Sequence, residues 1–226
     1  QWHSPELMLQ DNLPADKWRK RVTADMNLLP LYPWITPQSL IKAILEGDPY
    51  TIRSVYIQGS NILTTYSNSR EVYRSLSNLD FLAVADLFMT PTAAMADVVL
   101  PVASYLEYDS LNVTGYYPIA QVQQKVAQIG DCQSDYLILR GLAKRLGLES
   151  YFWASEREAL DAILQPVGLT FDEFRKVKAY SGHKLYRDYQ IKGFQTPSRK
   201  VEIYSSLLKG WGHDPLPVYH ELPETI

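Results

Sequence analysis

Two stretches of sequence decide the fold: IRSVYIQGSN at positions 52–61 and FLAVADLFMTPTAAMADVVLP at positions 81–101. Each opens with a short apolar run rich in β-branched or aromatic residues, and each run stops at a turn-forming or polar residue. The second stretch ends in another apolar run, which Pro101 stops. Short continuous apolar runs are typical of strands in a parallel sheet that is covered on both faces. We therefore expect strands at 52–58, 81–85 and 98–100.

Helical patterns separate and flank these strands. Thr36 is placed as an N-cap, Pro37 follows at the first helical position, and an apolar face then runs to Gly47. An amphipathic stretch at 69–78 lies between the first two strands, and a short helical turn is expected at 92–95. This alternation predicts an α/β fold, with a Rossmann-like parallel sheet and helices on both faces.

After Pro101 the pattern is less regular, with both helical and extended candidates. Apolar residues at helical spacing indicate a helix at 134–146. The segments 155–158 and 170–173 read as capping boxes, each of which opens a further helix. Extended structure is expected within 116–126, and 200–204 is a strand candidate.

The chain divides into two regions by sequence pattern. Residues 1–35 contain four prolines and three tryptophans without a sustained period, which is typical of a connector that packs along another part of a protein. Residues 36–226 carry the α/β pattern and end in an irregular segment rich in proline and glycine. We expect a connector at 1–35 and one domain at 36–226. Because the chain begins with Gln1 rather than methionine, we also expect it to be part of a longer protein.

The composition argues against several classes of function. Lysine and arginine number 22 against 25 acidic residues, and this net charge of −3 argues against a nucleic-acid-binding surface. The single cysteine, Cys132, excludes an internal disulfide and any cysteine-based iron–sulfur or zinc site within this chain. No apolar stretch approaches the roughly 20 residues needed to span a bilayer. The histidines have no spacing that suits a metal: His3, His183, His213 and His220.

Polar residues follow the first two expected strands. Ligands of α/β sheets bind beyond the carboxyl ends of the strands. In the segment 59–61 the glycine allows close approach of a ligand, while the serine and asparagine can bond phosphate or ribose oxygens. Asp86 can accept two parallel hydrogen bonds from the ring N–H and exocyclic amine of guanine, and Thr90 and Thr92 add hydroxyls. Singly, such residues are more often turns or caps, but together they indicate a nucleotide site.

The usual phosphate-binding fingerprints are absent. Neither G-x-G-x-x-G nor G-x-x-x-x-G-K-[ST] occurs in the sequence. Their absence argues against NAD, FAD and ATP as ligands.

Five stretches carry a family resemblance: VYIQGSN (55–61), LDFLAVADLFMTPTA (79–93), ADVVLP (96–101), LAKRLG (142–147) and GFQTPSRKVEIY (193–204). With Glu107 and the closing DPLP (214–217), they resemble the dimethyl sulfoxide reductase family of molybdopterin oxidoreductases. The resemblance runs in order from about Pro37 to the end. There are two departures: Arg199 stands where the family usually has glycine, and the usual Gly-Thr after the glutamate is replaced at 109–110.

The resemblance implies that this region is the third, Rossmann-like domain of such an enzyme. That domain holds the guanosine end of one of two molybdopterin guanine dinucleotides, which chelate molybdenum or tungsten. Carried over by position, seven residues would bind the cofactor: Gly59, Ser60, Asn61, Asp86, Phe88, Thr90 and Thr92. The family's metal-ligand domain and its N-terminal cysteine cluster, which would hold an iron–sulfur cluster, have no counterpart here. The chain alone is therefore expected to be inactive.

The resemblance also implies partners. They are the remainder of the same catalytic subunit and, as further candidates, electron-transfer subunits of the parent enzyme. We expect neither nucleic-acid binding nor membrane insertion. A stand-alone nucleotide- or protein-binding module of the same fold is the alternative. The substrate, the choice of molybdenum or tungsten, and a cytoplasmic or periplasmic location stay open.

Overall fold

The computed structural model describes residues 16, 20–22, 35–113, 119–182, 186–216 and 218–219. The chain divides into two compact units, one of Pro37–His183 and one formed by Gln1–Thr36 with Lys184–Ile226. Among the described residues, no helix has both the length and the apolar character needed to cross a membrane. Most of the expected connector at 1–35 lies outside the described residues, so the division into 1–35 and 36–226 stays a prediction.

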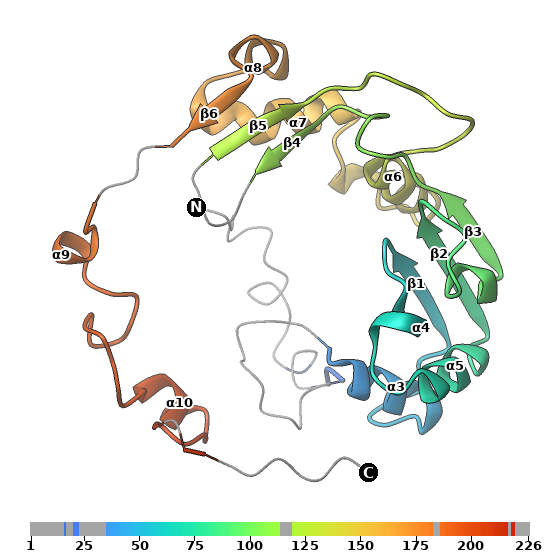
Figure 1. The fold of residues 1–226 in the computed structure, drawn as a ribbon, viewed down its shortest axis with the longest axis horizontal. Coiled ribbons are helices and arrows are strands. Elements are labelled where there is room, and N and C mark those ends of the chain that lie inside the picture. The colour runs from blue at the N-terminus through green and yellow to red at the C-terminus, as the bar shows by residue number, and fades with distance from the viewer. Residues whose placement is uncertain are drawn as a thin grey trace. The chain divides into compact units, whose positions relative to one another are not determined.

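The unit Pro37–His183 contains a parallel three-stranded sheet (Figure 1). Its strands are β1 (Ser54–Gln58), β2 (Phe81–Asp86) and β3 (Val98–Pro101), in the order β1-β2-β3. All three run parallel, as the continuous apolar runs predict. The α/β class is therefore confirmed, and β1 begins two residues later than the sequence suggested.

Helices cover one face of this sheet. They are α3 (Pro37–Leu45), α4 (Ile62–Thr65) and α5 (Ser69–Ser77), together with the 3-10 turn η2 (Ala93–Met95). The side chains buried between them and the sheet form the first core: Ile41, Ile57, Ile62, Val72, Leu76, Leu82, Val84 and Ala93. Full burial of one aliphatic side chain contributes about 1.5–3 kcal/mol, so this face anchors the unit.

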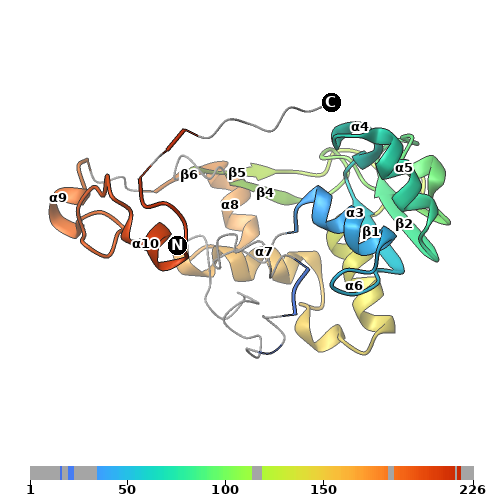
Figure 2. The ribbon, with the colours of Figure 1, turned by 90° about the horizontal axis from the view of Figure 1, so that it is seen from below.

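The opposite face of the sheet is met by α6 (Asp135–Arg145), as Figure 2 shows. The helix begins as predicted, because the Ser134 hydroxyl accepts a hydrogen bond from the Leu137 N–H at 3.3 Å. Its cover is incomplete: Phe81 and Val98 on this face remain 44% and 40% exposed. The predicted helices on both faces are present, but they cover the two faces unequally.

A second, antiparallel sheet follows in the same unit. It contains β4 (Ser110–Val113), β5 (Ile119–Gln123) and β6 (Ala179–Ser181), in the order β4-β5-β6. The extended structure expected within 116–126 is confirmed at β5, whereas β4 and β6 were not anticipated. Both strands have only three or four residues, too few to show a period.

Two helices pack on this second sheet, α7 (Glu156–Leu164) and α8 (Phe171–Val177). The capping box that opens α8 is complete, since the Thr170 hydroxyl accepts from the Glu173 N–H and the Glu173 carboxylate accepts from the Thr170 N–H. The buried residues of the second core are Leu160, Leu164, Phe171 and Phe174. The short 3-10 turns η3 (Glu149–Tyr151) and η4 (Gln165–Val167) flank α7.

The described part of the other unit contains α9 (Tyr189–Lys192) and α10 (Ser206–Gly210). The strand expected at 200–204 was wrong. The Glu202 carboxylate instead accepts hydrogen bonds from the Ser198 N–H at 3.1 Å and from the Ser206 N–H and hydroxyl at 3.2 and 2.9 Å. These bonds fold the segment into a turn, and the alternating Val201 and Ile203 side chains stay exposed.

Glu202 is expected to titrate far below an ordinary glutamate. Hydrogen bonds from Ser198 and then Ser206 favour the ionised carboxylate and lower its pKa from 4.5 to about 2. Because the folded pKa is depressed, the stabilisation is complete above pH 4.5 and is lost as the pH falls through about 2. Carboxyl-detected NMR should show this midpoint, and Ser206→Ala should raise it. A midpoint near 4.5 in the unmodified chain would contradict the turn.

Candidate functional site

The parallel sheet brings the two predicted loops to the same edge. The N–H of Gly59 donates to the carbonyl of Ala85 at 2.9 Å, which extends the pairing of β1 and β2 by one residue. Gly59 has a φ of +57°, a conformation that glycine adopts without the steric penalty of a Cβ. Its two chain neighbours aside, a Cβ added there would meet no atom of the described residues within 4 Å, so there is open space beside the glycine.

Asn61 and Thr92 hold the two loops together. The Thr92 hydroxyl donates to Asn61 Oδ1 at 2.7 Å, and the Leu63 N–H donates to the Thr92 hydroxyl at 3.1 Å. Thr92 is fully buried, so its hydroxyl is used inside the protein. Asn61 and Thr92 therefore set the spacing of the site, and their contact with a ligand stays a prediction.

Thr92→Val is expected to lower the free energy of unfolding by about 1–3 kcal/mol, because Asn61 Oδ1 and the Leu63 N–H lose a buried partner. Urea unfolding of this variant, of Asn61→Ala and of the double variant measures the coupling between the two side chains. Thr92→Ser keeps the hydroxyl and is the matched control. Strictly additive losses in the double variant would contradict the paired arrangement.

Asp86 ends β2 with its carboxylate held by its own loop. Oδ1 accepts hydrogen bonds from the N–H groups of Leu87 at 2.7 Å and Phe88 at 3.4 Å. No hydrogen bond to Oδ2 occurs among the described residues. Since each carboxylate oxygen has two acceptor sites, Asp86 is oriented by the protein and retains acceptor capacity for a ligand.

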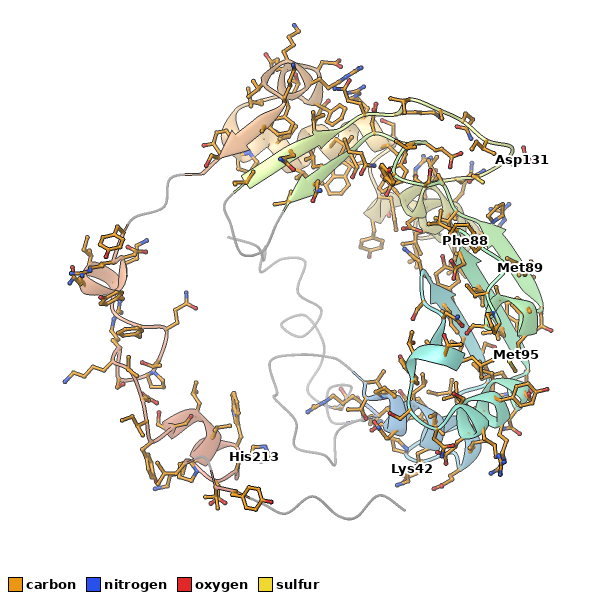
Figure 3. The ribbon with its side chains drawn as sticks, in the orientation of Figure 1. Lys42, Phe88, Met89, Met95, Asp131 and His213 are labelled. Carbon is orange, nitrogen blue, oxygen red and sulfur yellow. The ribbon has the colours of Figure 1, made fainter. Side chains whose placement is uncertain are left out.

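Exposed apolar side chains follow Asp86 directly. Leu87, Phe88 and Met89 are 53%, 76% and 69% exposed, and Figure 3 shows the last two on the loop that follows β2. The loop is closed by Thr90, whose N–H donates to the Phe88 carbonyl at 2.8 Å and whose hydroxyl accepts from the Ala93 N–H at 3.2 Å. A contiguous exposed apolar group on a hydrogen-bonded loop is typical of a contact site.

The remaining residues near the site differ in role. Ser60 is half-buried beside Gly59. Glu107, part of the family resemblance, is buried and accepts hydrogen bonds from the Ser104 N–H and hydroxyl and from the Ile129 N–H at 2.8–2.9 Å. These bonds, with that of the Ser104 N–H the largest cause, lower the pKa of Glu107 and keep it ionised. Glu107 therefore fixes two loop segments to each other.

Four features lie at this edge of the sheet. They are an oriented carboxylate acceptor, a serine hydroxyl, an exposed aromatic ring and the open space beside a glycine. Over the part of the chain that the structure describes, no cluster of three or more His, Cys, Asp or Glu side chains could hold a metal ion. Cys132 is a free, half-buried thiol.

The model of the molybdopterin oxidoreductase family matches residues 34–145, which include both strand-end loops. The chain belongs to the molybdopterin oxidoreductase family. This membership confirms the resemblance drawn from the five sequence stretches. Since members of the family carry a molybdenum or tungsten pterin cofactor, the ligand class follows from membership, while the identity of its nucleotide does not.

Two curated relatives illustrate the similarity. This chain is 36% identical to acetylene hydratase of Syntrophotalea acetylenica over 195 residues, which are 84% of this chain and 26% of that protein. It is 29% identical to the F420-dependent formate dehydrogenase subunit alpha of Methanocaldococcus jannaschii over 157 residues, 70% of this chain and 22% of that subunit. The chain thus spans about a quarter of the length of these relatives.

A solved structure supports the same assignment. Acetylene hydratase from Pelobacter acetylenicus matches this chain with a TM-score of 0.77 and 30% sequence identity. The match covers 91% of this chain and 30% of the acetylene hydratase chain.

Proposed function

We propose that this chain is the part of a molybdenum or tungsten oxidoreductase catalytic subunit that binds the guanosine end of a molybdopterin guanine dinucleotide. One observation carries the proposal: Asp86 is oriented by its own loop at the carboxyl edge of a parallel sheet and keeps free acceptor capacity. Family membership supports the pterin cofactor, and Asp86 supports guanine as its base.

The carboxylate distinguishes guanine from adenine by hydrogen-bonding chemistry. Guanine presents two neighbouring donors, the ring N–H and the exocyclic amine, and Oδ2 of Asp86, which keeps both of its acceptor sites, can accept them. Adenine presents an acceptor at the corresponding ring position, which a carboxylate repels. The exposed ring of Phe88, two residues further on, offers a surface for stacking of the base.

The other predicted residues have supporting roles in this proposal. Gly59 leaves room for close approach of the ribose or phosphate, and Ser60, the next residue, would supply a hydroxyl donor. Asn61 and Thr92 act through the loops, because their mutual hydrogen bond fixes the separation of Gly59 from Asp86. Thr90 closes the turn that carries Phe88.

In this proposal the bound cofactor supplies the redox chemistry of its metal, and the residues of this chain bind and orient its nucleotide. Residues 36–226 would form the cofactor-binding domain and 1–35 a connector. The partners would be the rest of the catalytic subunit and electron-transfer subunits, with an iron–sulfur cluster in the N-terminal part of the parent. The isolated chain should bind guanine nucleotides weakly and turn over no substrate.

The nucleotide released from the full-length catalytic subunit tests the proposal. Mild acid hydrolysis of the purified subunit, followed by chromatography, should release GMP in proportion to its molybdenum or tungsten content. Release of CMP, or of no nucleotide, would overturn the assignment of guanine to this site.

A further inference from the structure

A groove of about 600 Å³ lies between the less covered face of the parallel sheet and α6. Its sheet side includes Phe81 and Val98, and its helix side includes Leu137 and Leu142, all of which are at least one-third exposed. Strands of a parallel sheet are normally buried on both faces. The α3–α5 face meets that expectation, and the α6 face lacks part of its cover.

Gly141 points to close approach by another backbone. It lies in the middle of α6 and lines the groove, although glycine destabilises a helix interior by about 1 kcal/mol relative to alanine. Nothing in the described chain requires a glycine there, since an added Cβ would meet only Arg145 Nη1, at an ordinary 3.7 Å. A glycine with open space beside it is explained if a further segment packs against that point of the helix.

Arg145 carries the charge at the groove. It is the charged residue among those that line the groove, and its Nη1 donates to the Gly141 carbonyl at 3.0 Å. No ion pair of Arg145 occurs among the described residues. An arginine at the end of an apolar groove is suited to a carboxylate on the segment that fills it.

We propose that this groove receives an apolar segment of the same catalytic subunit, which packs closely on Gly141 and places an acidic side chain at Arg145. The relatives are about four times as long as this chain, so most of such a subunit lies outside it. The inference rests on the proposed function, because it requires that the chain be part of that longer subunit.

Substitutions at Gly141 should have opposite effects in the two contexts. In the 226-residue chain Gly141→Ala removes the helix penalty and meets no clash, so the melting temperature should rise by about 2–4 °C. In the full-length subunit the same change, and more strongly Gly141→Leu, should lower it by at least a similar amount. Ala143→Gly, on the same helix, should lower it in both contexts and is the control. A rise for Gly141→Ala in both contexts would overturn close packing at this position.

A photo-crosslinker identifies the occupant directly. With p-benzoylphenylalanine in place of Leu142 in the full-length subunit, mass spectrometry should find a cross-link to a peptide of the same polypeptide that contains Asp or Glu. A cross-link to another subunit or to a second copy, or no cross-link, would overturn the proposal. These outcomes do not depend on which nucleotide the enzyme releases, so failure here is distinguishable from failure of the cofactor assignment.

Discussion

Replacement of Phe171 by alanine is expected to lower the free energy of unfolding by about 3–5 kcal/mol. Phe171 is fully buried in the second core, where it packs with Phe174 and Leu160. The Arg157 guanidinium lies over the Phe171 ring at 4.6 Å from its centroid, and the backbone N–H of Phe171 donates to Asp161 Oδ1 at 2.7 Å. Alanine keeps the backbone bond but leaves a cavity and removes the cation–π contact, so the loss combines both effects.

Urea unfolding followed by circular dichroism measures this loss. Phe88→Ala is the matched control, because Phe88 is 76% exposed and its removal should change stability by less than about 0.5 kcal/mol. Equal effects of the two substitutions would contradict the second core as described.

Asp86→Asn is expected to abolish the preference for guanine over adenine. Asparagine keeps an oxygen that can accept the Leu87 and Phe88 N–H groups, so the loop should retain its conformation. Its amide nitrogen would replace Oδ2 and face a guanine donor with another donor. Hydrogen bonds to charged groups contribute about 1.5–3 kcal/mol each, so we expect a preference for GMP over AMP of about 30-fold to fall to about one.

Calorimetric titration of the chain with GMP and AMP measures this preference. Asp80→Asn is the control: Asp80 lies just before β2, whereas Asp86 ends it, and its carboxylate pairs with Arg53 at 2.5 Å. The same charge is lost at the far end of the same strand, so guanine preference should persist. Loss of the preference in both variants would indicate a general charge effect and contradict the role of Asp86.

The parallel sheet and its helices were predictable because their signals are local. The runs at 52–58, 81–85 and 98–100 are continuous and apolar, and caps such as Thr170 with Glu173 lie three residues apart. The elements that sequence reasoning missed are short, such as α4 and β6, so they cannot show a period. The prediction of a strand at 200–204 was wrong because the Glu202 carboxylate accepts hydrogen bonds from Ser198 and Ser206. These bonds stabilise a turn, although the apolar residues alternate as in a strand.

The site was predictable only in part. Gly59 and Asp86 lie at one edge of the sheet because β1 and β2 run parallel, and the continuous apolar runs predict that direction. The hydrogen bond between Asn61 and Thr92 joins residues 31 positions apart, so it cannot be predicted from a local sequence pattern. The partial exposure of the apolar face of α6 could not be predicted either. The spacing of apolar residues shows that a helix has an apolar face, but not how much of that face is covered.

The most direct test of the central claim is to map, by ¹⁵N-resolved NMR, which backbone amides of the 226-residue chain respond to GMP. The account predicts shifts concentrated at 59–61 and 86–92, much weaker shifts with AMP, and no selective shifts in Asp86→Asn. Equal responses to GMP and AMP, or shifts confined to residues away from the carboxyl edge of the parallel sheet, would contradict it.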